Sequence, residues 1–297
     1  MKPHEAKGLW LGALGVTIFA LTLPMTRLAV DTPAAPQMSG AFIALGRAVV
    51  AALLSALFLV ATRAPLPRRA DWLPLAITSA GVVFGFPLLT SIAMRHVEAV
   101  HASVIVGVLP LATAAVGAWL HRQRPSAGFW LCAAAGSALV VAFAVLRSGQ
   151  SGLSIQPADA LLLGAMACAA IGYGWGARLS QHMRAEHVIC WALVLSLPAT
   201  LAVTLVAAVA HPPHASAAAW SAFGYVTVIS MFLGFFAWYA GLARGGIAQV
   251  GQIQLAQPLL TLIWSALLLG EAVTPAAIIV ALVVLACVVL LQRIRRS

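Results

Sequence analysis

Residues 81–95 read GVVFGFPLLTSIAMR, and a near copy, SMFLGFFAWYAGLAR, follows at residues 230–244. A shift of 149 positions places Gly85 on Gly234, with a phenylalanine after each glycine. Both stretches are apolar and end in arginine, as expected for the end of a membrane-crossing helix. The sequence therefore predicts that this helix occurs twice in the chain.

A second pair of stretches supports a duplication of the whole chain. Residues 108–120, VLPLATAAVGAWL, resemble residues 256–268, AQPLLTLIWSALL, with Pro110 over Pro258 at a shift of 148. Because both shifts are close to half the length of 297 residues, we expect two homologous copies. The predicted copies are residues 1–148 and residues 149–297.

The composition predicts an integral membrane protein. Hydrophobic residues make up 62% of the chain and charged residues 8%, with a mean hydropathy of +1.00. A soluble globular chain carries about 25% charged residues, so this chain cannot cover itself with a water-facing surface. Ten apolar segments reach the length of about 20 residues that a hydrocarbon core about 30 Å thick requires. They are 8–28, 40–62, 72–93, 98–120, 127–146, 158–179, 188–210, 219–242, 248–269 and 275–292. We expect an all-α polytopic bundle.

The distribution of basic residues predicts how the bundle is oriented. The formal net charge is +10, and with both termini inside, most of the 17 Lys and Arg residues fall on the cytoplasmic side. The opposite side has Arg27, Arg95 and Arg147, while Arg47 lies within a segment. Cytoplasmic loops are enriched in Lys and Arg, so both termini are expected in the cytoplasm. Because topology accounts for the basic surplus, nucleic acid is not expected as a partner.

Five helices in each copy have a geometric consequence. The number is odd, so the second copy must enter the membrane from the opposite face. Such an inverted repeat places a pseudo-two-fold axis in the membrane plane. Two similar bundles can then open to either side by rocking, which is typical of alternating-access transporters. Since one chain holds both halves, a monomer is sufficient.

Four glutamines in residues 249–260, QVGQIQLAQPLL, point to the position of a binding site. An unpartnered amide costs about 2–7 kcal/mol to move into an apolar medium, and lipid cannot satisfy it. On a continuous helix Gln249, Gln252 and Gln257 share an arc of about 140°, with Gln254 just beyond it. This arc either lines a water-filled cavity or bonds to neighbouring helices. Gln252 and Gln257 are the leading cavity candidates, and Gln249 is expected near the cytoplasmic mouth.

Aromatic residues extend the candidate site. The stretch IGYGWGA, residues 171–177, contains Tyr173 and Trp175, and the eighth segment contains Tyr239. A polar tip on an apolar body suits a mixed cavity, whereas most membrane aromatics face lipid or the interface. A pocket of amides and aromatics fits a zwitterionic or neutral metabolite with an apolar side chain.

Four prolines predict kinks within the segments: Pro24, Pro87, Pro110 and Pro258. Each removes a backbone donor and frees a carbonyl one turn earlier. In a membrane that carbonyl must be satisfied by neighbours or water. The matched prolines Pro110 and Pro258 predict paired kinks, which either act as hinges beside a site or improve packing.

Two polar positions have more than one interpretation. Arg47 lies in an apolar segment, where a central arginine costs about 2.5–3.5 kcal/mol on insertion scales. It could contact a substrate carboxylate, or it could serve as a structural anchor that pairs with Asp31. Glu98 and His101 share one helical face, and either could carry a coupling proton, while Glu98 could instead stabilise a helix start. The sequence has no second such pair and no HExxH motif, so neither a metal nor a cofactor is expected.

The chain resembles the EamA branch of the drug/metabolite transporter superfamily over nearly its whole length. The likeness is carried by TLPMTRLAV (22–30), GFPLLT (85–90), HASVIVGVLPLATAAVGAW (101–119) and QPLLTLIWSALLLGE (257–271). It is most similar to bacterial exporters of aromatic and other amino acids, which implies an exporter in the bacterial inner (plasma) membrane. One feature departs from the family. The Gly270–Glu271 pair that follows the ninth segment has no counterpart after the fourth, where the chain reads HRQRPS.

The expected function is therefore export of small metabolites, and amino acids are the leading substrate. A nucleoside, a sugar or a cationic drug is the alternative substrate, although no acidic residue lies securely within a segment to bind a cation. A channel or a membrane-embedded enzyme is the alternative class of protein. The sequence shows no nucleophile–base or metal constellation beyond Glu98 and His101, so no enzyme is expected.

Overall fold

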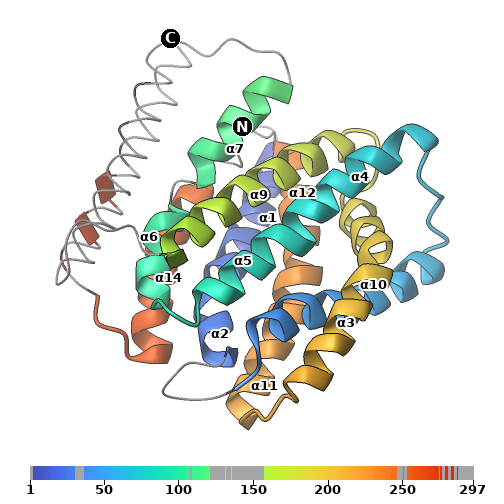
Figure 1. The fold of residues 1–297 in the computed structure, drawn as a ribbon. Coiled ribbons are helices and arrows are strands. Elements are labelled where there is room, and N and C mark those ends of the chain that lie inside the picture. The colour runs from blue at the N-terminus through green and yellow to red at the C-terminus, as the bar shows by residue number, and fades with distance from the viewer. Residues whose placement is uncertain are drawn as a thin grey trace.

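The computed structural model is helical throughout the part of the chain that it describes (Figure 1). That part comprises residues 3–30, 37–107, 109–120, 157–245 and 253–273, with single positions at 131, 135, 250, 275, 278, 279, 282, 283 and 286. Extended pairing within these residues is limited to one isolated bridge between Val30 and Met38. The all-α architecture expected from composition is confirmed for the described residues.

Six helical stretches are long and apolar enough to cross a membrane, and each coincides with a predicted segment. They are Ala6–Ala29, Gly40–Ala61, Arg69–Ala93, Pro157–Leu179, Ala185–Ala210 and Ala217–Gly245. The predicted segment 98–120 is divided into two short helices, and 248–269 ends in the shorter apolar helix Gln257–Leu269. The segments 127–146 and 275–292 lie largely outside the described residues. Ten spans and cytoplasmic termini therefore stay predictions.

Several of these stretches are composed of shorter elements in series. The first half contains α1 (Pro3–Ala20), α2 (Thr22–Ala29), α3 (Gly40–Ala61), η1 (Arg69–Asp71), α4 (Trp72–Ser79), η2 (Ala80–Gly85), α5 (Phe86–Ala93), α6 (Ala99–Val106) and α7 (Leu109–Leu120). The second contains α9 (Pro157–Leu179), α10 (Ala185–Ala210), α11 (Ala217–Gly224), η3 (Tyr225–Gly234), α12 (Phe235–Gly245), η4 (Gln254–Ala256) and α14 (Gln257–Leu269).

The changes of helix type occur at matched positions of the two predicted copies. The π-helices η2 and η3 end at Gly85 and Gly234, the pair related by a shift of 149. Likewise α7 begins at Leu109 and α14 at Gln257, each one residue before the matched proline. Such π-helical turns inside α-helices are often found at functional sites. The backbone is thus similar where the sequence is similar.

Helices of the first half pack against helices of the second. The helix α1 packs along α12, α9 along η2 and α5, and α3 along α10. Small residues allow the backbones to approach closely. A Cβ added at Gly8 would lie 2.4 Å from the backbone nitrogen of Gly245, and one at Gly81 would lie 2.4 Å from the carbonyl oxygen of Cys168. Close contact through small residues is how helices associate in lipid.

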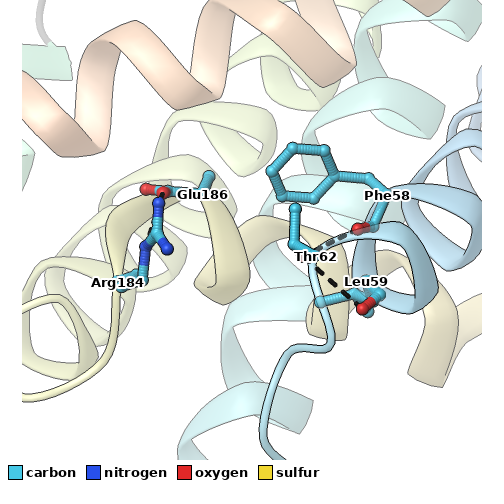
Figure 2. A network of polar contacts seen from close by, with 5 residues as sticks. All are labelled: Phe58, Leu59, Thr62, Arg184 and Glu186. Atoms are coloured by element: carbon cyan, nitrogen blue, oxygen red, sulfur yellow. Dashed lines mark hydrogen bonds and ion pairs between the residues drawn. The ribbon is translucent and has the colours of Figure 1, made fainter.

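The end of α3 lies beside the start of α10 (Figure 2). Thr62 donates its hydroxyl hydrogen to the Phe58 carbonyl at 2.7 Å, which satisfies one of the last carbonyls of α3. Facing it, Nε of Arg184 donates to the Glu186 carboxylate at 2.8 Å. The ring of Phe58 meets the ring of His187 edge-on, with 6.4 Å between centroids. The two hydrogen bonds each stabilise the end of one helix, and the Phe58–His187 contact joins α3 to α10.

Candidate functional site

A pocket lies between helices of both predicted halves. Elements α1, α2, α3, η2 and α5 form one wall, and α9, η3, α12 and α14 form the other. The lining residues are Phe19, Thr22, Leu23, Arg47, Val82, Phe86, Ala169, Tyr173, Ser230, Met231, Phe235 and Gln257. About 480 Å³ of space lies between these walls, the open side included.

Most of the lining is apolar, and two of its aromatic residues occupy matched positions of the two predicted copies. Phe86 and Phe235 directly follow the two π-helices and are related by the shift of 149. Both line the pocket, one from each half. The ring of Phe235 lies 5.0 Å from that of Phe19 and 6.0 Å from that of Tyr173, measured between centroids. The matched backbone features therefore place a matched pair of phenyl rings at the site.

Arg47 supplies a buried positive charge to the pocket. Its side chain lines the pocket from the middle of α3, and the residue is only 2% exposed. Its Nε has no hydrogen-bond partner, and within the described part of the chain Arg47 makes no ion pair. The alternative of an anchor paired with Asp31 involves a residue outside the described ranges. Within the described residues, the Arg47 guanidinium faces the pocket without a negatively charged partner.

The other polar groups of the lining come from α2, η3 and α14. The hydroxyls of Thr22 and Ser230 lie 2.8 Å apart and bond to each other across the two halves. Gln257, the first residue of α14, lines the pocket, and its Oε1 has no hydrogen-bond partner in the described residues. An amide oxygen and a guanidinium are thus available to a molecule in the pocket.

The predicted arc of glutamines is only partly described. Gln249 and Gln252 lie outside the described residues. Gln254 is buried but does not line the pocket, although Gln257 does. The arc assumed one continuous helix, whereas the 3₁₀ turn Gln254–Ala256 precedes α14. A 3₁₀ turn has a different angular spacing from an α-helix, so the angle between Gln254 and Gln257 differs from the one assumed for a continuous helix.

The three predicted aromatic candidates have different surroundings. Tyr173 lines the pocket. Trp175 does not, and its ring lies 5.2 Å beneath the Arg178 guanidinium. Residues two apart on a helix lie about 200° apart, so Tyr173 and Trp175 cannot face the same cavity. Tyr239 is fully buried, and its hydroxyl fills the space beside Gly176, 2.2 Å from where a Cβ would lie. Neither Trp175 nor Tyr239 lines this pocket.

His101 also lies away from the pocket lining. Its Nε2 is 2.6 Å from Oδ1 of Asp159, and both residues are buried, at 7% and 2% exposure. The pair joins α6 of one predicted half to α9 of the other. His101 is therefore paired with Asp159, and the described residues contain no group of three or more His, Cys, Asp or Glu side chains that could hold a metal ion. Asp159 is the second residue of the predicted segment 158–179 and was not among the residues expected from the sequence.

The start of α6 is capped from a distant part of the chain. Glu98 occupies the N-cap position, but its side chain makes no capping hydrogen bond. The carboxylate of Glu271 accepts the backbone N–H groups of Ala99 at 3.0 Å and Val100 at 2.8 Å. Glu271 follows α14, so this contact also joins the two predicted halves. Glu271 thus places a second carboxylate at the start of α6, where a negative charge stabilises the helix dipole.

The four prolines lie at helix breaks. Pro87, Pro110 and Pro258 are each the second residue of their α-helices, and Pro87 and Pro258 lie where a π-helix and a 3₁₀ turn change into an α-helix. Pro24 lies in α2, just after the break at Leu21. The Ala20 carbonyl that Pro24 leaves free accepts the Thr261 hydroxyl at 2.9 Å.

Known proteins are similar to this chain over its whole length. The model of the EamA-like transporter family matches residues 6–146 and 156–293. An "Uncharacterized transporter YdeK" from Bacillus subtilis (strain 168) is 40% identical over 293 residues, 96% of each chain. A solved structure described as "Crystal structure of protein" superimposes with a TM-score of 0.63 at 18% identity, covering 98% of this chain and 99% of the other. That structure shares the fold.

Proposed function

We propose that this chain, which belongs to the EamA-like transporter family, exports neutral and aromatic amino acids across a bacterial plasma membrane. It is a multi-pass membrane transporter and not an enzyme. The observation that carries the proposal is a pocket whose walls come from both predicted halves and combine phenyl rings with a guanidinium and an amide. Export as the direction follows from the likeness to amino-acid exporters noted in the sequence.

An amino acid with an apolar side chain fits this lining. Small-molecule sites are mostly apolar with a few polar groups that fix orientation. Here Phe86 and Phe235 supply flat apolar surface, while Gln257 and Arg47 supply the polar contacts. The pocket holds no acidic side chain among its described lining residues, which disfavours the cationic-drug alternative.

Alternating access between two inverted five-helix halves is the proposed mechanism. The family model matches the chain in two consecutive stretches, which fall within the predicted copies 1–148 and 149–297. The matched ends of η2 and η3, and the matched starts of α7 and α14, support the same interpretation. Rocking of two such halves about a central site exposes it to either side. One chain is sufficient, so the proposed functional unit is a monomer with both termini in the cytoplasm.

Counterflow into proteoliposomes tests the proposal. Vesicles preloaded with unlabelled phenylalanine should accumulate labelled phenylalanine with saturable kinetics. Phe235→Ala and Gln257→Ala should lower the rate at least about tenfold, because each removes a wall of the pocket. Leu57→Ala, on the exposed face of α3, is the matched control and should keep the rate.

Competition and kinetics separate the alternatives. Excess nucleoside or sugar should leave phenylalanine flux unchanged, and inhibition by either would replace the amino acid as substrate. Flux without saturation or counterflow would identify a channel. Absence of flux for every metabolite class would reject the transport proposal.

A further inference from the structure

We propose that the pocket selects its substrate by the carboxylate, through Arg47, and does not require an amino group. The substrate class is then an apolar organic monocarboxylate, of which a neutral amino acid is one example. This inference rests on the proposed function, because it defines the chemistry of the same pocket.

The state of Arg47 is the first argument. A buried charge is tolerated when it is paired or hydrogen-bonded, yet Arg47 is 2% exposed and its Nε is unpartnered. A guanidinium has five N–H donors in a fixed fork that matches the two oxygens of a carboxylate. A bound carboxylate would therefore satisfy both the charge and the donors.

The charge of the residues that line the pocket is the second argument. Among its lining residues, all of them described, Arg47 is the one charged side chain and none is Asp or Glu. A ligand ammonium would find no counter-charge and would be repelled by the guanidinium, since charges interact strongly away from water. A ligand carboxylate is instead attracted by the guanidinium. A single guanidinium also balances one negative charge, so a dianion such as phosphate leaves one charge uncompensated.

The remaining lining favours an apolar body. Phe86, Phe235 and Met231 line the pocket together with aliphatic side chains. The hydroxyls of Thr22 and Ser230 bond to each other and so are already satisfied. A compact inorganic anion would leave the phenyl rings without contact, whereas a carboxylate that carries a hydrocarbon group fills both parts of the pocket.

Thermal unfolding of the purified protein with four probes tests the inference. All four carry a phenyl ring: phenylalanine, 3-phenylpropionate, phenylalaninamide and 2-phenylethylamine. Ligands that bind the folded state raise the Tm by mass action. The two carboxylates should raise the Tm, with 3-phenylpropionate at least as effective as phenylalanine, and the two amines should leave it unchanged.

Variants of Arg47 separate recognition from a structural role. Replacing a buried charged group by an apolar one of similar size is often neutral or stabilising. Arg47→Met should therefore abolish the carboxylate-induced shift while leaving the Tm of the empty protein unchanged or higher. Arg47→Lys should keep the shift at concentrations about tenfold higher. Arg63→Gln removes the same charge from the exposed end of α3 and should keep the full shift.

Several results would overturn the inference. These are a Tm shift with 2-phenylethylamine, no shift with 3-phenylpropionate, or an Arg47-dependent shift with inorganic phosphate. An Arg47→Met protein that unfolds earlier or does not fold would identify Arg47 as a structural anchor. Saturable phenylalanine flux that is equal in Arg47→Met would sink this inference and leave the transport proposal standing. Carboxylate binding without any flux would reject the transport proposal and leave this inference standing.

Discussion

Thr261 donates its hydroxyl hydrogen to the carbonyl oxygen of Ala20 at 2.9 Å. That carbonyl would normally accept the N–H of the residue four positions later, but this residue is Pro24, which has none. A side chain of α14 thus completes the backbone of the α1–α2 break, four residues from Gln257 in the pocket lining. The kink in one predicted half is stabilised by the other half.

Removing this hydroxyl should destabilise the fold. Thr261→Val keeps the shape of the side chain but leaves the Ala20 carbonyl buried without a partner, which costs about 1–3 kcal/mol. Thr261→Ser should retain most of the stability. Thr17→Val is the control, because Thr17 bonds the Ala13 carbonyl within its own exposed helix turn. Equal unfolding temperatures for Thr261→Val and Thr261→Ser in detergent would contradict the role given to this bond.

The glycine contact between α1 and α12 should not tolerate a methyl group. In Gly8→Ala the new Cβ would lie 2.4 Å from the Gly245 backbone nitrogen, so the two helices must separate. Overpacking of this kind costs about 1–3 kcal/mol. Gly224→Ala, with nothing within 4 Å of its Cβ position, should instead stabilise by about 0.5–1 kcal/mol. Thermal unfolding of both variants checks the contrast, and a neutral Gly8→Ala would show that the helices are farther apart.

Two histidine–aspartate pairs should differ in their contribution to stability. His101 and Asp159 are both buried, so removing the imidazole leaves the buried carboxylate without this hydrogen bond, which costs about 1–3 kcal/mol. The His182–Asp71 pair has a histidine side chain that is 41% exposed, and exposed pairs contribute about 0–1 kcal/mol. His101→Ala should therefore unfold at much lower temperature than His182→Ala. Similar losses in the two variants would contradict the difference in burial.

The ionisation of Glu271 predicts that the stability of the fold depends on pH, in a direction that its pKa shift determines. Burial raises the pKa of this carboxyl above its usual value, and the hydrogen bonds from Val100 and Ala99 oppose the shift. The folded chain therefore binds the proton more tightly than the unfolded chain. The resulting stability is present below the unfolded pKa and is lost as the pH rises through the raised folded pKa.

Glu271→Gln cannot titrate, so it isolates this contribution. The Tm of the native protein minus that of Glu271→Gln should increase as the pH falls from about 7.5 toward about 5. Parallel unfolding scans of the two proteins give this difference directly. A difference that is constant, or that decreases on acidification, would reverse the assignment.

The helix positions could be predicted because length and hydropathy alone determine which segments can cross a bilayer. The six described spans accordingly coincide with predicted segments. The π-helices before Phe86 and Phe235 could not be predicted, because a switch from i+4 to i+5 bonding depends on neighbouring helices. The 3₁₀ turn before Gln257 could not be predicted for the same reason, and the arc of Gln249, Gln252 and Gln257 stays a prediction.

The polar part of the site was partly visible in the sequence. Arg47, Tyr173 and Gln257 were named because polar groups in apolar segments need a reason, and the structure places all three around one pocket. Trp175 and Tyr239 were named for their side-chain type alone, which does not determine the face of the helix. Asp159 and Thr261 were missed because their partners are distant in sequence, and short polar side chains give no periodic signal.

The helix α10 is the least enclosed of the described spans, with 22% of its apolar window buried where the others have at least 50%. Its 26 residues extend about 39 Å at 1.5 Å per residue, more than the hydrocarbon thickness of about 30 Å. Such hydrophobic mismatch is relieved by tilting the helix or by deforming the surrounding lipid. Because α10 packs against α3 of the other predicted half, a change in the tilt of α10 would change how the two halves are positioned relative to each other. We therefore expect the acyl-chain length of the host lipid to affect the rate of transport.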